Sequence, residues 1–159
     1  MIGAHELFVP AAAVIHDSDV SNAELRLSCN LPVGYKEFVS TLGSGAWAQS
    51  DITAPADLYA FDESVGHEMK GWIPLAENVD GCGNSVAFNC LDQKIYFCNH
   101  DPFGFVFVAN SFEEFIQTVA DRWLRDTRSG TRLFYESLPD FKEVIPLQQE
   151  RKHSWWKFW

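Results

Sequence analysis

Residues 72–119 carry the densest structural pattern in the sequence. A glycine-containing turn at Asp80–Asn84 precedes two β-branched and aromatic runs, Val86–Leu91 and Lys94–Cys98. Runs of this composition separated by a short polar linker favour a β-hairpin. Glycine suits the turn because it adopts positive φ without steric cost. We therefore predict antiparallel strands in this stretch.

The hairpin has a register that sorts its side chains by polarity. If Asp92 and Gln93 form the loop, Phe88 faces Phe97. A slip of one residue would mix the two faces, because side chains alternate along a strand. The more apolar face then consists of Val86, Phe88, Cys90, Ile95 and Phe97, and the other of Ala87, Asn89, Leu91, Lys94, Tyr96 and Cys98.

Helix-starting signals occur in three places. Ser111–Glu114 and Ser21–Glu24 both have the form of a capping box, in which serine and glutamate side chains each accept a backbone N–H. A third helix is predicted to start near Pro32 and to stop at Gly43. The helix after Ser111 has one apolar stripe at helical spacing: Phe112, Phe115, Ile116, Val119 and Trp123.

The remaining segments complete an α+β pattern. Residues 1–18 are predicted as an extended arm or edge strand, and Gly45–Ile52 as one strand that carries Trp47. Phe61–Gly71 is predicted as an acidic surface loop or helix. Hairpin strands with helices before and after them indicate an α+β fold.

Several of these motifs resemble the SUKH superfamily, which includes bacterial immunity proteins and fungal cell-wall-synthesis regulators. The matching pieces are Ile73-Pro74, the Asp80-Gly81-Cys82-Gly83 turn, Ile95–Phe97, His100-Asp101, Val108–Ile116, Leu31–Phe38 and Gly43–Gly45. Asn84 stands where relatives often carry an aspartate.

The resemblance implies one SUKH-like domain over residues 1–159. Its family core would be about 21–120, and residues 121–159 would form a C-terminal extension. It also implies a largely antiparallel central sheet flanked by helices, with a short helix or turn at Pro55–Leu58.

Charge is distributed unevenly along the chain. The net charge is −10, and residues 1–120 hold 16 acidic residues against 4 basic ones. This excess argues against a nucleic-acid ligand, because phosphate binding relies on lysine and arginine. It favours a basic protein partner through electrostatic steering. An equally simple interpretation is that the acidity only keeps the protein soluble.

The cysteines and the apolar runs point to the cytoplasm. Phe8–Ile15 is apolar but lacks a basic start, and no run is long enough to span a bilayer. The four cysteines have no C-x-x-C pairing, and the register above puts Cys90 and Cys98 on opposite faces. We therefore expect Cys29, Cys82, Cys90 and Cys98 to be reduced and buried, rather than in a disulfide or zinc site.

A polar set is expected at one end of the hairpin. Asn84 precedes the first strand and Asn99 ends the second, so they should lie together, beside Asp80, His100 and Asp101. The set has two interpretations: a ligand site or side chains that fix their own turns. The second is favoured, because metal sites usually offer several carboxylates or histidines. We predict no metal, no cofactor and no catalytic residue.

The last aromatic residues, Trp155–Trp159, leave several possibilities open. This Trp-rich tail (WWKFW) is expected to be buried against its own domain or to form a homodimer contact. It could instead bind a partner or touch a membrane, and a membrane is disfavoured by the acidic body.

By resemblance, the sequence predicts a non-enzymatic protein-binding module, namely an immunity protein that neutralises a cognate bacterial toxin by masking its surface. The alternative is a cytosolic regulatory or scaffolding protein, and a hydrolase-type enzyme ranks last. The expected partner is a basic toxin domain, with no nucleic acid and no membrane. The candidate partner-binding residues are Trp47, Asp62, Glu63, Glu68, Glu77, Asp80, Asn84, Asn99, His100 and Asp101.

Overall fold

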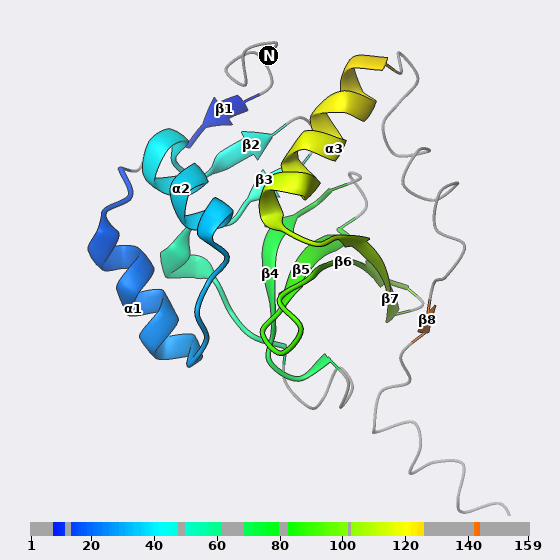
Figure 1. Ribbon diagram of the computed structural model, residues 1–159, viewed down its shortest axis with the longest axis horizontal. Helices are drawn as coiled ribbons and strands as arrows, with labels where there is room; N and C mark the ends of the chain where they lie inside the picture. The colour runs from blue at the N-terminus through cyan, green and yellow to red at the C-terminus, as the bar shows by residue number, and fades with distance from the viewer. Residues whose placement is uncertain are drawn as a thin grey trace, which may run out of the picture.

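The computed structural model describes residues 8–11, 14–47, 50–61, 69–79, 83–101, 103–125 and 142–143. These residues form an eight-stranded antiparallel sheet in which every strand pairs with its sequence neighbours (Figure 1). The strands are β1 (Phe8–Pro10), β2 (Gly45–Trp47), β3 (Ser50–Ile52), β4 (Trp72–Glu77), β5 (Ser85–Asn89), β6 (Ile95–His100), β7 (Phe103–Ala109) and β8 (Lys142–Glu143). The helices are α1 (Asp17–Leu27), α2 (Val33–Leu42), the short 3-10 helix η2 (Pro55–Asp57) and α3 (Phe112–Arg125). The predicted α+β fold is confirmed.

One face of the sheet packs against the α-helices. Tyr35 of α2 meets Phe112 of α3 edge to face, with ring centroids 5.5 Å apart, and its hydroxyl donates to the Thr53 carbonyl at 2.6 Å. Figure 1 shows α3 lying across the sheet and α1 beside η2. The largest buried side chains of this helix-facing core are Trp47, Tyr35, Phe88, Phe97, Phe112, Phe115, Leu58, Ile73, Leu75 and Ile95.

The β5–β6 hairpin has a register two residues away from the predicted one. Phe88 faces Ile95 rather than Phe97, so the loop is longer than Asp92-Gln93. The longer loop is closed by backbone hydrogen bonds between Asn89 and Lys94 and between Gln93 and Asn89. Because the shift is an even number of residues, the predicted sorting of Val86, Phe88, Ile95 and Phe97 onto one buried face survives.

The single strand predicted over residues 45–52 is wrong. The segment forms two strands, β2 and β3, that pair antiparallel with Trp47 opposite Ser50. A continuous strand would put Trp47 and Ile52 on opposite faces, because their numbers differ by five. The chain reversal lets both side chains enter the same core.

Helix α1 begins earlier than predicted. Its N-cap is His16, whose backbone N–H donates to the Asp19 carboxylate at 2.8 Å, so the capping box at Ser21–Glu24 is wrong. Ser21 lies inside the helix and donates to the Asp17 carbonyl. Glu24 instead binds beyond the helix end, accepting the Leu31 N–H at 2.8 Å and pairing with Lys36 at 3.0 Å.

The other helix starts follow the sequence more closely. Ser111 accepts the Glu114 N–H at 3.1 Å, as predicted, whereas the Glu114 carboxylate reaches the N–H of Asn110 instead of that of Ser111. Helix α2 ends at Gly43, as predicted. The helix or turn expected at Pro55–Leu58 is the 3-10 helix η2. Arg26 of α1 donates to three carbonyls of this segment, those of Pro55, Ala56 and Leu58.

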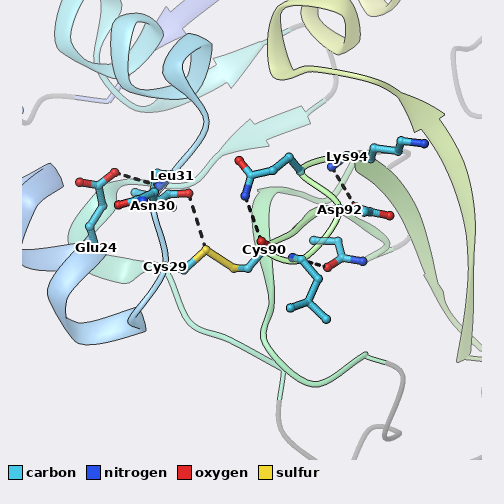
Figure 2. Close-up of a disulfide and its surroundings, with 10 residues drawn as sticks. Glu24, Cys29, Asn30, Leu31, Cys90, Asp92 and Lys94 are labelled. Carbon is cyan, nitrogen blue, oxygen red and sulfur yellow. Dashed lines mark hydrogen bonds between the residues drawn. A yellow bond between two sulfur atoms is a disulfide. The ribbon is translucent and has the colours of Figure 1, made fainter.

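The prediction that the cysteines are reduced is wrong for two of them. Cys29 and Cys90 form a disulfide across 61 residues of sequence. Figure 2 shows the bridge between the segment that follows α1 and the loop that connects β5 to β6. The predicted hairpin register relates Cys90 only to Cys98, whereas in the structure Cys90 lies in the loop beyond the last strand pair and bonds to Cys29, 61 residues away in the sequence. Cys98 is free and buried, and Cys82 lies outside the described residues.

Candidate functional site

The sheet face opposite the helix-facing core carries a second, aromatic cluster. Ala87 and Cys98 alternate with residues of the helix-facing core along β5 and β6, so they point to the other side of the sheet. Among the described residues, no α-helix contributes to this second cluster. We define the aromatic face by its rings: Tyr59, Phe61, Trp72, Tyr96, Phe103, Phe105 and Phe107.

Ring contacts run across β4, β6 and β7. The Trp72 ring centroid lies 4.6 Å from that of Tyr96 and 4.8 Å from that of Phe105. Tyr96 also meets Phe107, at 6.0 Å. Offset and edge-to-face contacts of this kind add to the stabilisation from buried area. The rings of Trp72, Tyr96, Phe105 and Phe107 are therefore linked by contacts across three strands.

The aromatic face is covered at one side and open at the other. Trp72 and Phe61 are buried together with Met69. Phe107, on β7, is 47% exposed, and Phe103, Phe105 and Tyr96 are only partly buried. We call these four rings of β6 and β7 the open half. Aromatic rings left partly in water and held in place by neighbours are typical of protein-binding surfaces.

Polar groups surround this face. The Tyr96 hydroxyl donates to the Asp92 carboxylate, and the Lys94 ammonium lies 5.6 Å above the Phe107 ring. Burial, the Asp92 hydrogen bond and the Asp92 charge raise the pKa of Tyr96 to about 12. Burial, with the charge and hydrogen bond of Glu77, raises the pKa of Tyr59 to about 12. Both hydroxyls thus stay protonated donors toward carboxylates at neutral pH.

Four members of the polar set predicted at the hairpin end, Asn84, Asn99, His100 and Asp101, lie together, whereas Asp80 lies outside the described residues. Asn84 directly precedes Ser85 and Asn99 directly follows Cys98. Because Ser85 pairs with Cys98, the two asparagines lie at the same end of the hairpin, as predicted. Asn84 is fully buried, and its Oδ1 accepts hydrogen bonds from His100. Asn99 is buried too and donates to the Asp101 carbonyl at 2.9 Å. The two amides therefore hold the chain together, while the exposed side chains of this set are His100 and Asp101.

The other predicted partner-binding residues differ in where they lie and in how far they are buried. Trp47 is 2% exposed and packs against Phe8 and Phe38, so its indole belongs to the core and offers no partner surface in this structure. Glu77 is half-buried, and its side chain is hydrogen-bonded to that of Tyr59. Asp62, Glu63, Glu68 and Asp80 lie outside the described residues, as does the Trp-rich tail.

The described residues offer little for catalysis or metal binding. Within them, no group of three or more histidine, cysteine and acidic side chains is placed to hold a metal ion. Burial raises the pKa of the Cys98 thiol to about 12, and a thiol that stays protonated is a poor nucleophile. The part of the chain that the structure describes also has no helix that is long and apolar enough to cross a membrane.

Sequence reasoning missed the open half of the aromatic face. The signal was Phe103, Phe105 and Phe107, three aromatics at every second position of one strand. Such a row reads as core, because a buried strand and a binding strand share this pattern. Only the position of β7, with no helix above these rings among the described residues, distinguishes the two.

A meandering antiparallel sheet with helices on one face and aromatic rings on the other defines a small α+β protein with a candidate binding surface. The model of the SMI1/KNR4 family (SUKH-1) matches residues 15–118, well over half of the chain. The chain therefore belongs to the SMI1/KNR4 family, within the SUKH superfamily. No curated protein and no solved structure is significantly similar to it.

Proposed function

We propose that this chain is a non-enzymatic protein-binding module, and specifically an immunity protein that neutralises a cognate bacterial toxin by masking its surface. The observation that carries the proposal is the open half of the aromatic face. Interface cores are enriched in aromatic residues, and their rims are polar. Phe107 supplies an exposed anchor with the Lys94 ammonium above its ring, and Asp92, which accepts the Tyr96 hydroxyl, supplies negative charge at the rim.

The charge of the surface supports a basic partner. Three cationic side chains in the described part make intramolecular contacts. Arg26 donates to backbone carbonyls, Lys36 forms an ion pair with Glu24, and the Lys94 ammonium lies above the Phe107 ring. Asp92 and Asp101 lie exposed at opposite ends of the β5–β6 hairpin. The net charge of −10 would accelerate encounter with a basic toxin domain and repel nucleic acid.

Binding to the toxin encoded by a neighbouring gene tests the proposal. We expect co-purification, and a dissociation constant that rises with salt because the rim is charged. Phe107→Ala should weaken binding at least tenfold, since truncating a central aromatic anchor commonly costs about 2 kcal/mol or more. Val33→Ala, at an exposed position of α2, is the matched control and should bind like the unchanged chain.

A toxin domain that binds Phe107→Ala as well as the unchanged chain would show that this face is not the masking surface. If no basic toxin domain is recovered with the unchanged chain, the immunity function itself is wrong.

A second candidate is a regulatory or scaffolding protein. Membership of the SMI1/KNR4 family supports it, because the SUKH superfamily that the sequence resembles includes fungal cell-wall-synthesis regulators as well as immunity proteins. The two functions differ in their partners, a toxin in one and an endogenous protein in the other. The presence or absence of a toxin gene beside this one separates them.

The redox state of Cys29 and Cys90 is an indicator of the compartment in which the protein resides. The cytoplasm expected from the sequence would keep Cys29 and Cys90 reduced, whereas the structure joins them. The disulfide therefore removes the support that reduced cysteines would give to a cytoplasmic location. Rapid alkylation of intact cells followed by mass mapping would report the state of both thiols. A bonded pair in growing cells would contradict a cytoplasmic location.

A further inference from the structure

A groove lies beside one half of the Cys29–Cys90 disulfide. Its volume is about 540 Å³, and it is lined by residues of α1 and of the turn that follows this helix: Ser21, Glu24, Leu25, Ser28, Cys29 and Asn30. Cys90 is not among these lining residues, although both cysteines are half-buried. Within the described part of the chain, the groove therefore gives access to the bridge from the side of Cys29.

The walls of the groove suit a small molecule. Its volume falls in the range of small-molecule sites, and its lining combines the exposed Leu25 side chain with serine and asparagine side chains. The one charged side chain among the lining residues is Glu24, whose carboxylate accepts the Leu31 N–H at 2.8 Å and pairs with Lys36 at 3.0 Å. Because this carboxylate is already paired, it offers less repulsion to an incoming anion such as a thiolate.

The surroundings of Cys29 determine which sulfur leaves when the bridge is attacked. Cys29 follows Ser28, the residue that caps the C-terminal end of α1, and a helix carries partial negative charge at that end. The Asn30 carbonyl oxygen also lies 3.6 Å from the Cys29 Sγ (Figure 2). Both features disfavour negative charge on Cys29, and thiol–disulfide exchange is faster when the leaving sulfur carries negative charge more easily.

We propose that the groove is a thiol–disulfide exchange site for a low-molecular-weight thiol, in which Cys29 is the sulfur attacked and Cys90 the leaving thiolate. A bond forms between the sulfur of the small thiolate and the Cys29 Sγ as the Cys29–Cys90 bond breaks. The electron pair of the broken bond stays on Cys90, which then takes a proton from water. The products are a mixed disulfide at Cys29 and a free thiol at Cys90, with no net oxidation or reduction.

The exchange would change how the loop between β5 and β6 is anchored. The bridge ties this loop to the segment after α1, and the same loop carries Asp92 and Lys94, which contact Tyr96 and Phe107 of the open half. The inference concerns the free chain and does not depend on the proposed function. Its test needs no toxin, so its failure is distinguishable from failure of that function.

The test is a brief treatment of the oxidised full chain with β-mercaptoethanol, stopped in excess N-ethylmaleimide and mapped by mass spectrometry. We expect the mercaptoethanol adduct on Cys29 with maleimide on Cys90, at least tenfold more abundant than the reverse pattern. Equal amounts of the two patterns, or an excess of adduct on Cys90, would overturn the proposal. It would also be overturned by an absence of adducts under conditions that open the disulfide of a linear peptide.

A pair of variants tests the groove as the route of attack. Ser21 lines the groove, whereas its neighbour Asn22 is exposed on the same helix and does not line it. Ser21→Trp should fill part of the groove and slow the exchange at least fivefold, and Asn22→Trp should react like the unchanged chain. Equal rates for the two variants would show that the thiol does not enter through the groove.

Discussion

Asn84 holds His100 through one oxygen atom. Its Oδ1 accepts the backbone N–H of His100 and meets the ring Nδ1, each at 2.8 Å. Because an amide oxygen can only accept, Nδ1 carries the proton in this contact. The bond joins the residue before β5 to the last residue of β6, so it fastens the open end of the hairpin.

Asn84→Ala should therefore lower the free energy of unfolding by about 1–3 kcal/mol, the usual cost of leaving a buried polar group without its partner. His100→Ala, which keeps the backbone bond and removes only the ring contact, should cost about 1 kcal/mol or less. Urea titration of both variants measures the difference. A larger loss for His100→Ala than for Asn84→Ala would contradict this account.

The Cys29–Cys90 disulfide should contribute strongly to stability. It closes a long loop, and a cross-link of this kind removes conformational freedom from the unfolded chain, which is typically worth roughly 2–4 kcal/mol. Thermal melts with and without reducing agent should differ by several degrees. The Cys29→Ser/Cys90→Ser chain should match the reduced protein and show no further response to reductant, which is the internal control.

Gly45 should tolerate no side chain. A Cβ there would overlap the Val9 carbonyl oxygen and lie 2.6 Å from the Ala11 nitrogen, which are backbone atoms of β1 and its continuation. Gly45→Ala should therefore push β1 away and cost roughly 2–4 kcal/mol. At Gly83, which also has a positive φ, a Cβ would meet no atom of the described residues within 4 Å, so Gly83→Ala should cost only the conformational term, about 1–2 kcal/mol. Denaturant unfolding of the pair tests whether the contact with β1 matters.

Stability should fall as the pH rises above about 9. The pKa of Cys98 is raised from 9.0 to about 12, and those of Tyr59 and Tyr96 from 10.0 to about 12. A group with a higher pKa in the folded state binds more protons there than in the unfolded state, so the stability it contributes is lost as pH rises through this range. Urea midpoints at pH 8, 10 and 11 should decline in order. Tyr59→Phe should flatten the decline, and a flat profile for the unchanged chain would contradict the prediction.

The sequence predicted the faces of the central hairpin better than its register. Alternation identifies which side chains share a face, and this property is unchanged by a shift of two residues. It carries no information about the loop, where the Asn89 and Asp92 side chains accept N–H groups of Leu91 and Lys94. The disulfide was missed for a related reason, because the approach of residues 29 and 90 is tertiary and leaves no local spacing.

The candidate site was predicted in part. The Asn84 and Asn99 pairing could be derived, because hairpin geometry alone brings the two ends together. Trp47 was misinterpreted, since an aromatic residue on a short strand looks the same in the sequence whether Phe8 and Phe38 cover it or not. The open half of the aromatic face depends on which side of β7 the helices pack, and that is decided by the whole fold.

The order of the sheet has a consequence for synthesis. Each described strand pairs with the strand made just before it, so the ladders can form as the chain leaves the ribosome. The disulfide has to wait, because Cys90 is made 61 residues after Cys29, a delay of roughly 3–12 s at 5–20 residues per second. Cys82 is made in that interval, eight residues before Cys90 (90 − 82). Cys82 is therefore made before the correct partner of Cys29, and pairing with Cys90 is favoured when the β5–β6 loop takes shape before oxidation occurs.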